Sequence, residues 1–207
     1  ALLAARGWTI EDMLERRGSA MHLFWPDHSL SVPGPGASPT AKSLDEQARE
    51  RLERTREIER FFADATVWVK QGDKAPPVPA WEAMRPVLTG RMPLMIHVQG
   101  SREIRAALHW AESHPELRLT LVGGRDAWRF AEELAKREVA VIYSEVFALP
   151  LRATDPYDVH FSAPGILHRA GVTVAIAENL DRANASGQRN LPYLAAQAAA
   201  FGLPTDA

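Results

Sequence analysis

The sequence predicts an α/β protein built on a parallel β-sheet. Short apolar runs rich in β-forming residues alternate with longer stretches whose apolar residues recur at helical spacing. The runs are apolar almost throughout, which is typical of strands buried on both faces of a parallel sheet. Five such strands could form a small open sheet, or the second part of a barrel that needs eight strands to close. The predicted strands span residues 21–25, 94–98, 117–122, 139–143 and 172–177.

Helical patterns separate the predicted strands. The longest covers residues 44–70, with small or apolar residues on one face and acid-to-arginine pairs such as Asp45 with Arg49 on the other. We interpret this charged face as a solvated helix surface. A first helix is expected over residues 9–17, where Thr9 is a suitable N-cap residue. Further helices are predicted over residues 101–113, 125–137 and 190–201.

Two proline-rich stretches interrupt the alternation. Residues 26–40 read PDHSLSVPGPGASPT and are too long for a plain connector, so we expect them to form a functional loop or lid. Residues 72–79 form a shorter break. The sequence therefore predicts one incomplete domain over residues 1–207, with residues 26–40 as its loop or lid.

Composition narrows the classes of function and partner. The chain has 207 residues, 46% of them hydrophobic, which is enough for one globular domain. A net charge of -2 and a pI near 6.4 give no reason to expect nucleic acid as a partner. There are no cysteines, which excludes disulfides and thiolate chemistry. No apolar run approaches the roughly 20 residues of a membrane span. The chain lacks an initiator methionine and a signal-peptide pattern, so we expect a piece of something longer.

A family resemblance begins at residues 93–150, which read PLMIHVQGSREIRAALHWAESHPELRLTLVGGRDAWRFAEELAKREVAVIYSEVFALP. It continues through DPYDVHFSAPGILHRAGVTVAIAENL and RNLPYLAAQAAAFGLP, and covers residues 19–204. These phrases resemble the metal-dependent amidohydrolase superfamily, in particular its imidazolonepropionase-like and prolidase-like members. The resemblance implies a distorted (β/α)8 barrel of the TIM type, to which this chain supplies roughly strands four to eight.

The same resemblance implies that part of the barrel lies outside the chain. Barrel strands one to three and the small β domain that flanks the barrel are absent from residues 1–207. Five strands alone would expose apolar sheet edges. We therefore expect the remainder of the same polypeptide, or a second chain, to complete the barrel, and a homo-oligomer is one way to do so.

The resemblance also implies a metal site at the carboxyl ends of the strands. In the family the metal lowers the pKa of a bound water, and an aspartate accepts its proton during attack on an amide carbon. For this chain the resemblance implies one divalent ion, zinc or similar. His97 matches the strand-five histidine ligand, and His22, in AMHLFWP, falls where a carboxylated lysine often stands. Gly123 stands at the strand-six histidine position and offers no ligand. Asn179 replaces the strand-eight aspartate, and its amide cannot act as a general base.

The expected site is therefore degenerate. A divalent transition ion generally wants four or more ligands. His97 and His22 reach that number only together with a His-x-His pair from a strand before residue 1. The alternative for each is an imidazole satisfied by neighbouring groups. Glu145 and Glu178 are the acids expected near the barrel mouth, where either could replace the missing base, although strand alternation disfavours Glu178.

Three further residues are candidates for binding a substrate. In VGGRDAW two glycines lie between a strand and a helix whose first turn carries Arg125, an arrangement that can hold a carboxylate or phosphate. The stretch lacks the GxGxxG and P-loop spacings, and its alternative interpretation is a tight turn that needs glycine. His160, in the expected loop after the fourth strand, could line a pocket near Tyr157.

These observations lead to one expected function and one alternative. We expect metal-assisted hydrolysis of an amide or cyclic amide C–N bond, in a peptide or N-acyl amino acid type of substrate, with weakened or lost activity. The alternative is a non-catalytic barrel, a pseudoenzyme without a cofactor, that binds a ligand or acts as a structural subunit of a larger assembly. The resemblance alone slightly favours a bacterial periplasmic or exported location.

Overall fold

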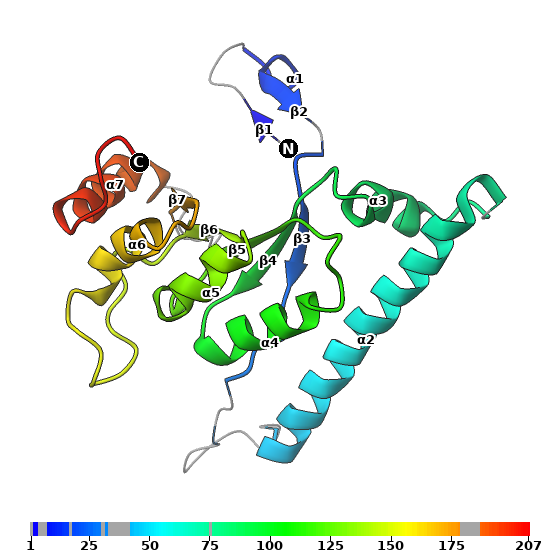
Figure 1. Cartoon of the computed structure of the whole chain (residues 1–207), viewed down its shortest axis with the longest axis horizontal. Helices are drawn as coiled ribbons and strands as arrows, with labels where there is room; N and C mark the ends of the chain where they lie inside the picture. The colour runs from blue at the N-terminus through cyan, green and yellow to red at the C-terminus, as the bar shows by residue number, and fades with distance from the viewer. Residues whose placement is uncertain are drawn as a thin grey trace.

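Five parallel strands form the central sheet of the computed structural model, with helices packed around it (Figure 1). The strands are β3 (Met21–Phe24), β4 (Leu94–Val98), β5 (Leu119–Gly123), β6 (Ala140–Tyr143) and β7 (Val174–Ile176). Each pairs in parallel with the next, in chain order. The structure describes residues 2–3, 8–16, 18–29, 32, 42–74, 76–178 and 187–207.

The order of the strands is that of a singly wound sheet. A doubly wound sheet reverses its strand order part-way and carries helices on both faces, whereas a barrel keeps chain order with its helices outside. In this chain the order β3-β4-β5-β6-β7 never reverses, and α4 and α5 lie on one side of the sheet (Figure 1). The predicted α/β class with a parallel sheet is confirmed, and the arrangement is consistent with part of a TIM-type fold.

The two faces of the sheet differ in burial. On the helix side Ile96, Leu121 and Val141 are 0% exposed and form the centre of the core. On the other face the side chain of Phe24 is 72% exposed, and His97 is half-buried. The expectation that the strands are buried on both faces is therefore wrong for this chain. An apolar run does not reveal which partner covers its second face, and nothing in the described residues covers this one.

Amphipathic helices cover the helix side of the sheet. In α4 the buried residues Ile104, Ala107, Leu108 and Ala111 follow helical spacing. In α2 the capping box of Ser43 begins the helix, and its buried residues lie only in the C-terminal half. The helices are α2 (Leu44–Gln71), α3 (Pro79–Leu88), α4 (Ser101–Ala111), α5 (Ala131–Lys136), α6 (Val159–Arg169) and α7 (Leu191–Ala200), with short 3-10 turns η1 (Gly72–Lys74) and η2 (Ala127–Phe130).

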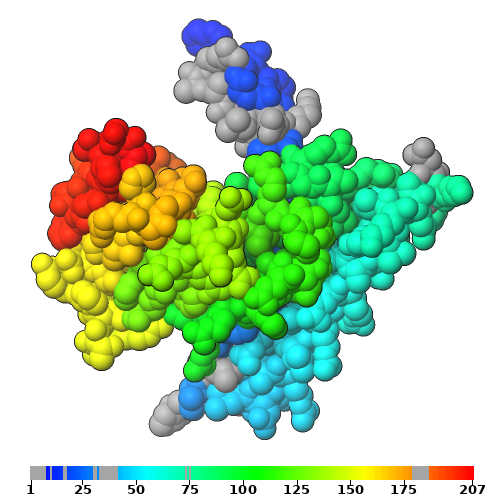
Figure 2. All heavy atoms as spheres, viewed as in Figure 1, coloured from blue at the N-terminus to red at the C-terminus, as the bar shows by residue number. Residues whose placement is uncertain are grey.

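The amino-terminal segment differs from its predicted helix. The Thr9 capping box is present, but α1 (Ile10–Met13) ends after four residues. The next residues form β2 (Leu14–Arg16), which pairs antiparallel with β1 (Leu2–Leu3). One helical turn is only marginally stable, so the pairing partner decides the conformation of residues 14–16. In Figures 1 and 2 the pair of short strands β1 and β2 projects from the body of the molecule.

Proline hid two helices from sequence analysis. Pro79 occupies the first turn of α3 and Pro86 lies inside it, while Pro164 lies inside α6. Proline normally marks a break, but it is tolerated in a first turn, and packing outweighs one lost hydrogen bond later. The predicted helix over residues 125–137 is a turn followed by η2 and α5. Residues 30–31 and 33–40 of the expected loop lie outside the described residues.

No helix in the described part of the chain is long and apolar enough to cross a membrane.

Candidate functional site

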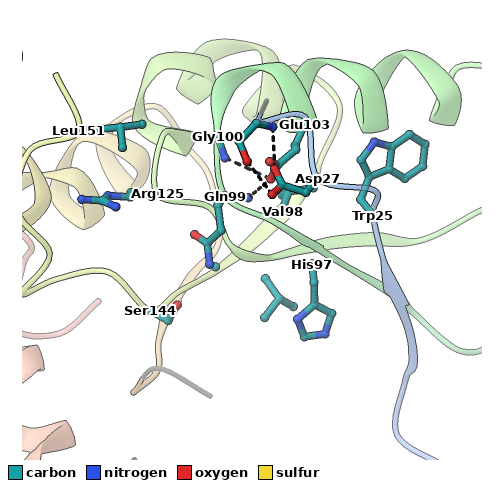
Figure 3. Close-up of a pocket in the computed structure, with 13 residues that line it drawn as sticks. Trp25, Asp27, His97, Val98, Gln99, Gly100, Glu103, Arg125, Ser144 and Leu151 are labelled. Carbon is teal, nitrogen blue, oxygen red and sulfur yellow. Dashed lines mark hydrogen bonds between the residues drawn. The ribbon is translucent and has the colours of Figure 1, made fainter. Parts of the chain in front are cut away.

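A pocket of about 470 Å³ opens at the carboxyl ends of β3 to β6 (Figure 3). Its lining comes from the strand ends and from the loops that follow them, and includes Asp27, His97, Gln99, Glu103 and Arg125. Parallel strands bring their carboxyl ends to one edge, where backbone turns leave side chains free to meet a ligand. The pocket therefore lies where α/β barrels place their chemistry.

His22 and His97 meet on the open face of the sheet. In the register of β3 and β4, Phe24 lies opposite His97, so alternation puts His22 and His97 on the same face. Their Nδ1 and Nε2 atoms lie 2.9 Å apart in a hydrogen bond. The Phe24 ring stacks on His97 with 4.2 Å between ring centroids. Burial, and then the charge of His22, lower the pKa of His97, so its ring is neutral at pH 7 and keeps a lone pair for a metal.

The geometry of this pair fits one metal ion only in part. Zn–N bonds of about 2.0–2.1 Å in a tetrahedral site put two imidazole nitrogens about 3.3 Å apart, a few tenths of an ångström beyond the separation of His22 and His97. A metal also needs further ligands. Among the described residues, no group of three or more His, Asp or Glu could hold an ion. The described residues therefore offer a pair of nitrogens and no third ligand beside them.

The structure explains why Gly123 cannot be replaced by a ligand. A Cβ at this position would lie 2.7 Å from Nε2 of Gln99 and 2.8 Å from the carbonyl oxygen of Val98. The backbone φ of Gly123 is +92°, a conformation that residues with a side chain rarely adopt. The Gln99 amide occupies the space that a strand-six histidine would need.

Neither of the two expected catalytic acids lines this pocket. Asn179 lies outside the described residues. The Glu178 carboxylate is directed at Gly187, where an added Cβ would lie 2.8 Å from Oε1. Glu145 follows β6 and accepts a hydrogen bond of 3.2 Å from the Ser144 hydroxyl. Neither Glu145 nor Glu178 is among the residues that line the pocket beside His97.

The three expected substrate-binding residues have different surroundings. Arg125 lines the pocket, and its Nη2 donates to the backbone carbonyl of Leu149. Tyr157 is 80% exposed and is not part of the lining. His160 lies in the first turn of α6 and is 2% exposed, so the prediction that it lies in a loop is wrong. The turn before His160 leads into α6, and α6 packs against the sheet so that the His160 ring is buried.

His160 belongs to a buried pair behind Arg125. Its Nδ1 and the hydroxyl of Tyr143 lie 2.8 Å apart in a hydrogen bond. Burial, and then the charge of Arg125, lower the pKa of His160. The His160 ring is therefore neutral at pH 7 and does not add a second positive charge beside Arg125.

A charge network missed by sequence analysis fixes the turn after β5. Asp126 is 1% exposed and accepts hydrogen bonds from the Ser101 backbone and hydroxyl, at 2.9 and 2.6 Å. Arg152 donates to both of its carboxylate oxygens, at 3.0 and 2.7 Å. Burial alone would raise the pKa of Asp126, but the hydrogen bonds from Arg152 and Ser101 bring it down to about 2. Arg129 and Asp155 form a further ion pair beside it. No local motif signals contacts between residues this far apart in the sequence.

Sequence analysis also missed two carboxyl groups in the pocket wall. Glu103 accepts hydrogen bonds from the backbone of Gln99 at 2.6 Å and of Gly100 at 3.3 Å, which caps α4. Asp27 accepts hydrogen bonds from the backbone and hydroxyl of Ser29, at 2.7 and 2.6 Å. Burial raises the pKa of Glu103. Burial also acts to raise the pKa of Asp27, but the hydrogen bonds from Ser29 lower it overall. In the sequence, Glu103 stands at the third position of α4, and this position was the signal from which its capping role could have been predicted.

Comparison with known proteins adds one likeness. No family model matches the chain, and no curated protein matches it. Among solved structures, an amidohydrolase from Thermotoga maritima MSB8 superposes with a TM-score of 0.66 at 14% sequence identity. The chain has an amidohydrolase-like fold. The match covers 99% of this chain and 52% of the other, so the chain spans about half the length of that structure.

The extent of this likeness agrees with the open face of the sheet. Nearly all of this chain has a counterpart in the larger structure, whereas about half of that structure has none here. An exposed Phe24, and outer strands β3 and β7 that each pair on one side only among the described residues, are consistent with part of a barrel. At 14% identity the comparison shows the fold alone, and the chemistry has to be tested separately.

Proposed function

We propose that this protein hydrolyses an amide or cyclic amide C–N bond in a ligand bound at the carboxyl ends of its strands. The observation that carries the proposal is the meeting of His22 and His97, from neighbouring parallel strands, with nitrogens 2.9 Å apart beside a pocket. Reactions on α/β barrels take place at this end of the strands. The amidohydrolase-like fold supports the class of reaction.

The proposed metal site takes two of its ligands from this chain. His22 and His97 would hold one divalent ion, zinc or similar, with the remaining ligands from outside the described residues. The neutral state of His97 supports this assignment. The two nitrogens, 2.9 Å apart in a hydrogen bond, would have to separate by a few tenths of an ångström to hold the ion. When bound, such an ion makes water a stronger nucleophile at neutral pH.

Other groups in the pocket would bind the substrate and hold a proton. We assign a substrate carboxylate to Arg125, which lines the pocket. Asp27 and Glu103 both line the pocket, and their side chains share a hydrogen bond, so the two carboxyl groups can hold one proton between them. We place the proton acceptor there and not at Glu145 or Glu178, because neither of those lines the pocket.

The surroundings of Gly123 favour a second candidate function. Because Gln99 and the Val98 carbonyl fill the space for a third ligand, the pocket is also suited to bind its ligand without a metal. A non-catalytic barrel of this kind would keep the pocket and Arg125 and would lack bound zinc.

We further propose that the remaining strands of a barrel, from the same polypeptide or a second chain, cover the open face. A groove of about 780 Å³ runs between β3 and α2 and is lined by apolar side chains that include Phe24 and Phe61. β3 is an outer strand of the sheet, so its edge can pair with a further strand. The groove then receives the helix or loop that accompanies that strand.

Metal analysis of the full-length protein tests the proposal. We expect close to one zinc per chain in the wild type, loss of most of it in His97→Ala, and retention in the control His109→Ala. His109 is a matched control because it lies on α4 with its side chain exposed, outside the pocket. Zinc content that is equal in all three proteins contradicts the assignment of His97. Wild-type protein without zinc that still binds a pocket ligand supports the second candidate.

A further inference from the structure

We infer that the loop between β6 and α6, residues 147–158, is a strap that gates the pocket, and that the contact of Arg152 with Asp126 is its latch. While the latch is closed, Leu151 completes one wall of the pocket. When the latch opens, the strap swings away and the pocket opens on the side of β6. The strap governs access to the pocket under either candidate function.

The strap has buried ends and no buried apolar side chain between them. Val146 and Val159, which flank it, are 0% and 2% exposed. Figure 1 shows the strap as a long loop that extends from the body of the molecule. Every apolar side chain of residues 147–158 is exposed or half-buried. The large exposed ones are Phe147, Leu149, Leu151 and Tyr157. Among these the one ring contact joins Phe147 to Phe161, at the end next to β6. A segment with so little apolar burial opens locally at a lower free energy than the whole domain unfolds.

The contact between Arg152 and Asp126 has the properties of a reversible latch. Arg152, on the strap, donates to both carboxylate oxygens of Asp126, at 3.0 and 2.7 Å. Asp126 is 1% exposed, and two hydrogen bonds from Ser101 remain on its carboxylate when Arg152 leaves. The Arg152 side chain is 40% exposed, so water replaces Asp126 around its guanidinium. The latch therefore breaks without leaving either charge wholly unpaired.

Two further tethers come from the same short turn of the body. Arg125 donates to the backbone carbonyl of Leu149, and Arg129 forms an ion pair with the Asp155 carboxylate. The Arg129 side chain is 35% exposed, so water competes for this pair as well. All the tethers meet the body within residues 125–129, and we therefore expect them to form and break together.

The middle of the strap is stiff, so it moves as one piece. Pro150 and Pro156 restrict the backbone on either side of it. Between them the Asp155 N–H donates to the Arg152 carbonyl at 3.0 Å, and the Arg152 N–H donates to the Asp155 carboxylate at 3.2 Å. This closed turn holds the Arg152 side chain in position for the latch.

The strap borders the pocket at Leu151. This side chain is 48% exposed and lines the pocket, and Figure 3 shows it next to Arg125, on the side away from His97. Ser144, which directly follows β6, also lines the pocket. When the strap swings away, Leu151 leaves the wall and the pocket gains an opening beside Ser144. A gate of this kind lets a ligand enter and then shields it from water.

Thiol alkylation in the full-length, metal-free protein tests the gate. Residues 1–207 contain no cysteine, so Ser144→Cys, in a background without other cysteines, places one reactive thiol in the pocket. N-ethylmaleimide reacts with it at a rate that follows the population of the open state, provided that the strap closes faster than the thiol reacts. Arg152→Gln removes a charged contact, so we expect alkylation to be about 10- to 100-fold faster than with the native latch. Arg152→Lys, which keeps the charge, should give an intermediate rate.

Two controls separate opening of the strap from general loosening of the fold. Thr154→Ala changes an exposed strap residue that forms none of the tethers, and should leave the alkylation rate of Ser144→Cys unchanged. Ser113→Cys places the thiol at an exposed position after α4, at the end of this helix away from the pocket. Arg152→Gln should not change the alkylation rate of Ser113→Cys.

Spin labels measure the movement of the strap itself. Labels at Ala153→Cys on the strap and at His109→Cys on α4, both exposed positions, should give one main distance with the native latch. A second, longer distance should appear in Arg152→Gln. If Arg152→Gln does not fold, Arg129→Gln, which removes the tether to Asp155, takes its place in both assays.

Three results overturn the inference. They are equal alkylation of Ser144→Cys with and without the latch, an equal rise for Ser144→Cys and Ser113→Cys, and a label distance that the loss of the latch does not change. Neither assay depends on zinc or on hydrolysis, so the proposed reaction stands or fails by its own test.

Discussion

Replacing Asp126 by asparagine is expected to loosen the turn that carries Arg125. Asp126 is 1% exposed and accepts four hydrogen bonds, two from Ser101 and two from Arg152. Asparagine keeps the shape of the side chain but removes its charge, and its NH₂ group faces the donors of Arg152. The Arg152 guanidinium then keeps only its longer ion pair with Asp155, at 3.4 Å, while the volume of the core hardly changes.

The size of the effect follows from the pKa of Asp126. Its value of about 2 in the folded chain, against 3.8 for the free group, corresponds to about 2 kcal/mol of stability at neutral pH. Because the folded pKa is lowered, this contribution is present above pH 3.8 and is lost as the pH falls through 2. About half of it is gone at pH 3.

Urea unfolding at several pH values measures this effect. We expect Asp126→Asn to lower the free energy of unfolding by about 2 to 3 kcal/mol at pH 7, and the gap from the wild type to shrink by about 1 kcal/mol at pH 3. The exposed Asp64→Asn on α2 serves as the control, with a change below about 0.5 kcal/mol at pH 7. A gap below 0.5 kcal/mol for Asp126→Asn, or one that stays constant between pH 7 and pH 3, refutes the reasoning.

Three further predictions follow from the same geometry. Gly123→Ala should lower the free energy of unfolding by about 2 to 4 kcal/mol, because the φ of Gly123 is +92° and the added Cβ would make close contacts. In the control Gly100→Ala the added Cβ has nothing within 4 Å, so the loss should be less than about 1 kcal/mol. Equal losses for the two variants in urea unfolding contradict this prediction. In metal-free protein His97 should titrate below 6.5 by NMR. Because its folded pKa is lowered, its protonation should reduce stability as the pH falls below that value; a titration above 6.5 contradicts the burial described. Tyr143→Phe removes the hydroxyl 2.8 Å from buried His160 and should cost about 1 to 3 kcal/mol in the same urea assay, where no change refutes the bond.

The sequence was sufficient to predict the sheet but not its exposed face. Apolar runs such as residues 94–98 and 139–143 predict strands because few residues within each run favour any other conformation. The helices α3 and α6 were missed because Pro86 and Pro164 look like breaks in a single sequence. The open face could not be predicted, since an apolar run does not reveal whether anything covers its second face.

The candidate site was predictable only where a strand fixes it. The family resemblance matched His22 and His97 to ligand positions on neighbouring strands, and the parallel register brings them together. Asp126 with Arg152, and Gln99 with Gly123, meet through loops whose paths no local pattern dictates. Most of the contacts that the sequence did not reveal are therefore made by residues on or beside loops.

The most direct test of the central claim is anomalous diffraction at the zinc edge from crystals of the full-length protein. The account predicts one zinc peak within bonding distance of Nδ1 of His22 and Nε2 of His97, with both rings inside a closed barrel. A zinc peak elsewhere, or His97 turned away from the carboxyl ends of the strands, contradicts it.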